Sequence, residues 1–254
     1  MNFDDFLEEL RKWLQSINDS KKVDDIILDG KYFSYDKSTN SYSINEENIE
    51  QFKDVDYLFV GDNPGENEKD HRAFFYVELT DGWIEKHKST AGYKFYKFTK
   101  RLSEDDKKRI MTFNKCLFFT TETDDLEQTQ VNDSEIFVVS FFDIFKKYNA
   151  NLKIVFMGLT EKIFDSIYKK VYRSNKDIIV TPHPRFSLYK YDGTEIIKKE
   201  NIKLDNFYQL WENVNLLKNF IDNSPPESTL DGGNLINNDD EDDDGDASSP
   251  CVVR

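Results

Sequence analysis

The sequence has few of the residues that hold metal clusters or small secreted domains together. Its 254 residues include only two cysteines, Cys116 and Cys251. Two thiols are too few for a disulfide scaffold, a four-cysteine zinc site or a four-thiolate iron–sulfur cluster. The three histidines, His71, His87 and His183, form no His-x₃-His or Glu-flanked pair. The sequence therefore predicts neither a bound metal nor another cofactor.

Long hydrophobic runs are also lacking. No apolar stretch approaches the roughly 18 residues needed to cross a bilayer, and the acidic start MNFDDFLEEL lacks the basic-then-apolar order of a signal peptide. We therefore expect a soluble monomer without a membrane partner, cytoplasmic, or nuclear in a eukaryotic cell.

Aromatic residues and acidic residues, by contrast, are abundant. The chain contains 21 Phe, 13 Tyr and 3 Trp, which can bury a large area and exclude disorder of the whole chain. The net charge of −15 argues against a general nucleic-acid binder.

Much of that charge lies in the segment 223–254, which holds nine acidic residues and one arginine. This segment also contains Pro, Gly and Ser but few apolar residues, so we expect a disordered acidic tail after a domain that spans 1–222. The tail is a solubilising segment, a contact for a protein partner, or a competitor of phosphates for a basic surface of the domain.

Short apolar runs alternate with helical patterns along the domain. Strands are expected at 56–60, 116–120, 152–157 and 177–181. Helices are expected at 3–17, 91–102, 134–149, 160–172 and 204–221. This alternation predicts an α/β fold, a three-layer α/β/α sandwich with a mainly parallel central sheet of about four strands. In such sheets, ligands bind beyond the carboxyl ends of the strands.

Two proline-containing loops directly follow expected strands. The first is GDNPG at 61–65, where Asp62 and Asn63 would lie at the sheet edge. The second is TPHPR at 181–185, where two prolines flank His183. Each loop taken alone is also compatible with an ordinary turn, but both should lie at the same edge of the sheet.

The two loops together resemble motifs of the uracil-DNA glycosylase superfamily. Its first motif is a Gly-x-x-Pro-Gly or Gly-x-Asp-Pro-Tyr turn after the first strand, and its last is a His-Pro-Ser loop after the fourth. STAGYKFYKF at 89–98 is similar to the family's Gly-x-Ala-Gly helix start, and LKIVFMGLTEKIF at 152–164 to its strand-Leu-Gly-helix segment. The resemblance covers about 55–190.

The resemblance implies an enzyme that hydrolyses the N-glycosidic bond of uracil, or of a related damaged pyrimidine, in DNA and leaves an abasic site. Either Asp62 or Asn63 would position the water, and His183 would stabilise the leaving base. Phe75, or else its neighbour Phe74, would stack on the flipped base unless both are core residues. The remaining base-binding positions would be Gly61, Pro64, Gly65 and Thr121.

Two departures from the family pattern leave an alternative open. The family usually has an asparagine at the end of the second strand, whereas the run at 116–120 leads into Thr120 and Thr121, and Asn114 precedes it. Arg185 stands where the family has a serine, which favours a phosphate contact. The alternative is a non-catalytic member of the fold that binds a nucleobase, DNA or a protein partner.

A basic stretch at 86–103 contains no acidic residue. In a helix from about residue 91, Lys94, Lys97 and Arg101 would share one face and contact DNA, while the aromatic face packs inward. A solvated helix face with no DNA contact is the competing interpretation.

Overall fold

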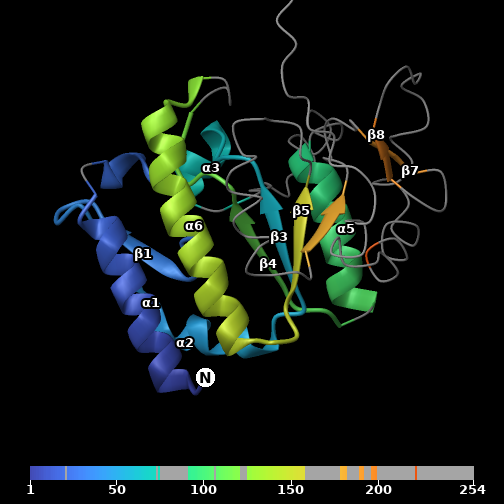
Figure 1. Ribbon diagram of the computed structural model, residues 1–254, viewed down its shortest axis with the longest axis horizontal. Helices are drawn as coiled ribbons and strands as arrows, with labels where there is room; N and C mark the ends of the chain where they lie inside the picture. Colours follow the sequence, from blue (N-terminus) through green and yellow to red (C-terminus); the bar gives the residue numbers. More distant parts are fainter. Residues whose placement is uncertain are drawn as a thin grey trace, which may run out of the picture.

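The computed structural model of the chain has a parallel sheet at its centre. The described residues are 1–20, 22–72, 74, 91–105, 107–120, 125–157, 178–181, 189–191, 196–198 and 221. The sheet contains β3 (Tyr57–Gly61), β4 (Ile110–Asn114), β5 (Lys153–Met157) and β6 (Ile178–Thr181). The strand order is β4-β3-β5-β6, and each neighbouring pair is parallel (Figure 1). The α/β class expected from the sequence is thus confirmed.

The side chains of β3 contribute to two apolar clusters, one on each face of the sheet. All five of its residues are buried, as expected for a strand with covered faces and neighbours on both sides. Side chains alternate between the faces of a strand, so Leu58 and Val60 join one cluster while Tyr57 and Phe59 join the other.

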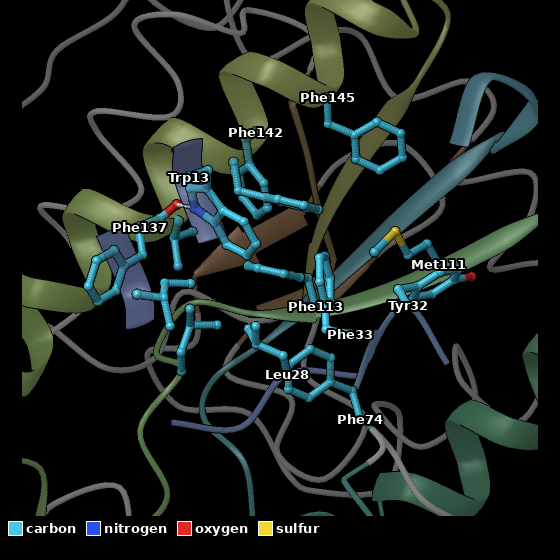
Figure 2. Packing of buried hydrophobic residues seen from close by; sticks show 14 of the residues in the cluster. Trp13, Leu28, Tyr32, Phe33, Phe74, Met111, Phe113, Phe137, Phe142 and Phe145 are labelled. Atoms are coloured by element: carbon cyan, nitrogen blue, oxygen red, sulfur yellow. Dashed lines mark hydrogen bonds between the residues drawn. The ribbon is translucent and has the colours of Figure 1, made fainter. Parts of the chain in front are cut away.

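Two helices, α1 (Phe3–Asn18) and α6 (Gln128–Tyr148), cover the first face. The Trp13 indole of α1 donates a hydrogen bond to the Phe137 carbonyl oxygen of α6, at 2.8 Å. Phe141 of α6 stacks on Phe113 of β4 with ring centroids 4.4 Å apart. Figure 2 shows Trp13 and Phe113 converging with Phe142 in this core.

The helix α5 (Ala91–Asp105) packs on the second face. Phe95, Phe98 and Leu102 are buried, and the rings of Phe95 and Phe98 meet Phe59 edge-on. This confirms the inward aromatic face expected for the helix. Ile221 is buried in the same cluster.

An antiparallel hairpin, β1 (Phe33–Asp36) and β2 (Ser41–Ile44), follows α1 and the short helix η1 (Val23–Asp25). α2 (Glu46–Ile49) and η2 (Glu50–Asp54) then lead into β3, which α3 (Glu66–His71) follows. A second antiparallel pair consists of β7 (Tyr189–Tyr191) and β8 (Ile196–Lys198). The sequence analysis predicted neither antiparallel pair.

Arg72 ties the end of α3 to the hairpin region. Its guanidinium lies 3.8 Å from the ring centroid of Tyr35 and donates hydrogen bonds to the Tyr42 hydroxyl and to the Ile26 carbonyl oxygen. Its own carbonyl accepts from the Gly30 N–H at 2.7 Å. A Cβ at Gly30 would lie 3.1 Å from that oxygen, so the close approach favours glycine. Arg72 has a φ of 45°, a left-handed conformation that these contacts stabilise.

The prediction of a strand at 116–120 is wrong. Residues 116–120 form no ladder, and within them Phe118 makes only an isolated bridge to Ile26. The strand is β4, which ends at Asn114. The run at 116–120 is apolar because Cys116, Leu117 and Phe118 are buried against the first core, and apolar runs alone do not separate strands from buried loops.

Several expectations lie outside the described residues. They are the helix at 160–172, all of the expected helix at 204–221 except Ile221, and the tail at 223–254. In the part of the chain that the structure describes, no helix has the length and apolarity needed to span a bilayer.

Phe141→Ala tests the first core. Phe141 is fully buried and its ring also contacts those of Trp13, Phe33 and Phe52. Truncation should lower the free energy of unfolding by about 3–5 kcal/mol in chemical denaturation. Ile136→Ala on the same helix, where the side chain is 63% exposed, should change it by less than about 0.5 kcal/mol. A loss below about 1 kcal/mol for Phe141→Ala would contradict this packing.

Candidate functional site

The carboxyl ends of the strands bring four chain segments to one edge of the sheet. Gly61 at the end of β3 lies opposite Asn114 at the end of β4. On the other side of β3, Met157 of β5 lies opposite Thr181 of β6. The predicted loop with His183 follows Thr181 in the sequence, whereas the side chain of His183 lies outside the described residues.

The pairing of β3 and β4 continues beyond the ends of both strands. The Lys115 N–H donates to the Gly61 carbonyl oxygen at 2.9 Å, and the Cys116 N–H donates to the Asp62 carbonyl oxygen at 2.8 Å. These two hydrogen bonds fix the first residues of the GDNPG turn against those that follow β4. The start of the turn is therefore joined by backbone hydrogen bonds to the residues that follow β4.

The predicted residue Asn63 is held by Thr120. The Asn63 amide nitrogen donates to the Thr120 hydroxyl oxygen at 3.0 Å and to the Pro64 carbonyl oxygen at 3.3 Å. Pro64 is buried, while Asn63 is half-buried. Thr120 thus fixes the side chain of Asn63 in the turn. The neighbouring Thr121, which was predicted to bind the base, lies outside the described residues.

Gly65 begins α3. Its N–H donates to the Glu68 carboxylate at 2.5 Å, which satisfies one of the donors left open at a helix start. Its φ is −90°, so the backbone here does not require glycine. The rigidity of the turn comes from the buried Pro64 and the Asn63–Thr120 hydrogen bond.

Asp62 forms an ion pair with Lys115. The Lys115 ammonium lies against Asp62 Oδ1. The Lys115 side chain is 1% exposed and that of Asp62 is 17% exposed, with Oδ1 itself buried. A buried ammonium needs a paired anion, because an isolated charge is strongly disfavoured in a low-dielectric interior. The sequence analysis missed Lys115, because its pairing with Asp62 follows from the register of β3 and β4 and not from a local sequence pattern.

Asn114 corrects the prediction about the second strand. We expected the second strand to end at Thr120, but it ends at Asn114, directly opposite Gly61. The residue is 1% exposed, and in the described part of the chain its amide nitrogen has no hydrogen-bond partner. Buried polar groups are nearly always hydrogen-bonded, so this amide lacks the partner that its burial normally requires.

Cys116 lies next to these residues, but its thiol is not reactive. It is buried beside the Ser134 hydroxyl of α6 at 3.2 Å, and Ser134 also accepts from the Leu117 N–H at 3.1 Å. Burial raises the pKa of the Cys116 thiol to about 11. Since the thiolate is the nucleophile, Cys116 packs the loop against α6 and is not a reactive group.

The predicted DNA-contacting residues of α5 differ in their exposure to solvent. Lys97 and Arg101 are exposed, as is Lys100, but Lys94 is buried at 8% exposure and is not part of the solvent-facing basic surface. Lys97 lies over the Tyr93 ring at 5.9 Å and Lys100 over the Tyr96 ring at 6.0 Å.

Phe74 packs as a core residue. It is 6% exposed and meets Phe113 edge-on at 5.7 Å. It also lines a groove of about 580 Å³ between α5 and β4, together with Phe95, Tyr96 and Thr112. Phe75 and Arg185 lie outside the described residues.

The sequence matches no family model and no curated protein. Among the described residues, no group of three or more His, Cys, Asp or Glu side chains lies close enough to hold a metal ion.

The reactivity of Cys116 tests the packing beside the site. In a Cys251→Ser variant at pH 8, an aromatic disulfide reagent should label the native protein at least about 100-fold more slowly than a free thiol, because about one thiol in a thousand is ionised. The same variant unfolded in guanidinium should react rapidly with one equivalent. Rapid labelling of the folded protein would contradict the buried position.

Proposed function

We propose that the chain is a DNA glycosylase of the uracil-DNA glycosylase type that releases uracil, or a related damaged pyrimidine, from DNA. Its fold would be the three-layer α/β/α sandwich of that family. Helices that pack on both faces of the parallel sheet support this fold. The observation that carries the function is the position of Asn114. This residue is the last of β4, lies opposite Gly61 of the GDNPG turn, and has a buried side-chain amide.

A carboxamide in that position suits the edge of a pyrimidine base. Its nitrogen donates hydrogen bonds and its oxygen accepts them, and uracil presents carbonyl oxygens beside an N–H. A buried amide that has no hydrogen-bond partner among the described residues favours a base that offers both types of group, because unpaired groups reject a base that lacks them.

The reaction needs a positioned water and a stabilised leaving group. The water oxygen bonds to the sugar C1′ while the bond from C1′ to the base breaks, and the electron pair leaves with the base. The proton lost by the water passes to a carboxylate and then to solvent, and the base anion gains a proton. Asp62 or Asn63 is proposed to hold the water, His183 to stabilise the anion and Phe75 to stack on the base.

The exposed cations of α5 are proposed to contact the DNA backbone. α5 ends at Asp105, shortly before β4 begins at Ile110, so its last turn lies toward the amino ends of the strands. Its earlier turns, with Tyr93 and Lys97, therefore lie nearer the carboxyl edge. Local basic surface of this kind attracts phosphates even on a protein of negative net charge.

Uracil-containing oligonucleotides test this function directly. The wild-type protein should release free uracil and leave alkali-labile abasic sites. Removal of one positioned hydrogen-bonding group at a reacting base lowers the rate about 100-fold or more, so Asn114→Ala should do so. Asn132→Ala, on the exposed face of α6, is the matched control and should retain the wild-type rate.

Two results would contradict the enzyme. The first is release of uracil by the wild type no faster than by an Asn63→Ala, His183→Ala double variant. The second is tight binding of uracil-containing or abasic DNA without turnover, which would favour a non-catalytic member of the fold.

A further inference from the structure

The exposed side of α5 carries the cations Lys97, Lys100 and Arg101. Residues three and four positions apart are neighbours on a helix surface, so these side chains form one patch, which we call the α5 basic surface. The exposed carboxylate of Glu104 lies 3.8 Å from the Lys100 ammonium and offsets part of the charge. Exposed ion pairs of this kind are weak, so they do not prevent an exchange for another anion.

The C-terminal segment of the chain leaves the domain on the same face of the sheet. Ile221 is 2% exposed and belongs to the buried cluster that contains Phe95 and Phe98 of α5. This cluster lies on the second face of the sheet, whereas α1 and α6 cover the first (Figure 1). Residues 222–254 therefore start from the face that α5 covers.

This segment has the charge that the α5 basic surface attracts, and it is long enough to reach it. Seven of the eight residues at 239–246, DDEDDDGD, are acidic, and we call them the acidic block. The 17 residues at 222–238 join the block to Ile221 and can extend to about 60 Å at most. The 15 residues of α5 span only about 22 Å. The acidic block can therefore reach every cation of the surface.

Attachment to the same chain favours this contact over one with a separate partner. A tethered group within reach of its site acts at an effective concentration in the millimolar range. The clustered carboxylates of the acidic block present closely spaced negative charges, as the phosphates of a DNA strand do. The block and DNA are thus alternative ligands for the same cations.

We propose that the acidic block binds the α5 basic surface of its own chain and competes there with DNA. Because DNA must displace the block before it reaches the cations, the block weakens the binding of all DNA by the same factor, with or without uracil. The reaction of bound DNA at the carboxyl edge is unchanged. The contact does not require the glycosylase function, whereas its effect on uracil release rests on the function proposed above.

The salt dependence of DNA binding follows from this competition. DNA that binds an open basic surface releases the counterions condensed on its phosphates. DNA that displaces the acidic block releases fewer counterions overall, because the block takes up counterions as it leaves. The block should therefore weaken DNA binding most at low salt and have little effect at high salt, where the contact is screened.

The test uses the full chain and a control that is matched in charge. A tail variant loses four charges of the acidic block, and a control variant loses four exposed charges of α1 on the other face of the sheet. The tail substitutions are Asp240→Asn, Glu241→Gln, Asp242→Asn and Asp243→Asn. The control substitutions are Asp4→Asn, Asp5→Asn, Glu8→Gln and Glu9→Gln. A surface variant carries Lys97→Gln, Lys100→Gln and Arg101→Gln.

Binding of a fluorescent duplex without uracil is measured by anisotropy at about 50 mM and about 500 mM NaCl. Exposed charge contacts are individually weak, so the tail variant should bind about 3- to 10-fold more tightly than the wild type at low salt. At high salt the two should agree within about 2-fold. The control variant should stay within about 2-fold of the wild type throughout, and the tail substitutions should change the affinity of the surface variant by less than about 1.5-fold.

Cross-linking tests the contact itself, including in a protein that binds no DNA. A carbodiimide joins a carboxylate to an amine that it touches, with loss of water. Monomers of the wild type should therefore yield amide links from 239–246 to Lys97 or Lys100, which an excess of duplex DNA suppresses. Links to other lysines only, links in covalent dimers only, or no links would overturn the inference.

Three binding results would also overturn the inference. They are equal affinities of the tail variant and the wild type at low salt, an equal gain in the tail and control variants, and an undiminished gain from the tail substitutions in the surface variant. Uracil release separates this inference from the proposed function. The tail variant should have the maximal rate of the wild type at a lower half-saturating DNA concentration, whereas absence of release by the wild type would refute the glycosylase and leave the contact standing.

Discussion

The parallel pairing of β3 with β4 is the constraint on which the candidate site depends. It places Gly61 opposite Asn114 and continues for two residues beyond the strands, through hydrogen bonds to the carbonyls of Gly61 and Asp62. Because of this extension, a turn and a loop that lie more than fifty residues apart in the sequence behave as one rigid edge. A one-residue slip in the register would move Asn114 away from the turn and reverse the faces of every β4 side chain.

The aromatic cores maintain that register. Phe113 precedes Asn114 and is held by the ring of Phe141, while Phe59 precedes the end of β3 and meets Phe95 and Phe98 on the opposite face. The favourable burial of these rings offsets the unfavourable burial of Lys115 and of the Asn114 amide. The folded state thus tolerates the buried Lys115 and the Asn114 amide because apolar contacts elsewhere in the two cores stabilise it. Polar groups that a fold buries without full internal pairing are commonly found where a ligand completes the pairing.

Much of this fold was predictable because its central elements follow simple periodicities. The buried run of β3 and the amphipathic patterns of α1 and α5 were read correctly to within a few residues. β4 was misread, because the mixed pattern around Thr112 resembles a surface segment and the apolar run from Cys116 to Phe118 resembles a strand. The same error hid Asn114, whose proposed role depends on its position at a strand end. The GDNPG turn was predictable from its residue types alone, whereas Lys115 was not, since its pairing with Asp62 follows from the register and from no local sequence signal.

The central claim is that the sheet edge formed by Asn114 and the GDNPG turn receives a pyrimidine base. A crystal structure of the protein with an oligonucleotide that carries a hydrolysis-resistant deoxyuridine analogue tests it most directly. The account predicts a base turned out of the DNA, with its edge within hydrogen-bond distance of the Asn114 carboxamide and its sugar beside Asp62. DNA bound at another surface, or an Asn114 amide already hydrogen-bonded to this chain's own residues when DNA is bound, would contradict it.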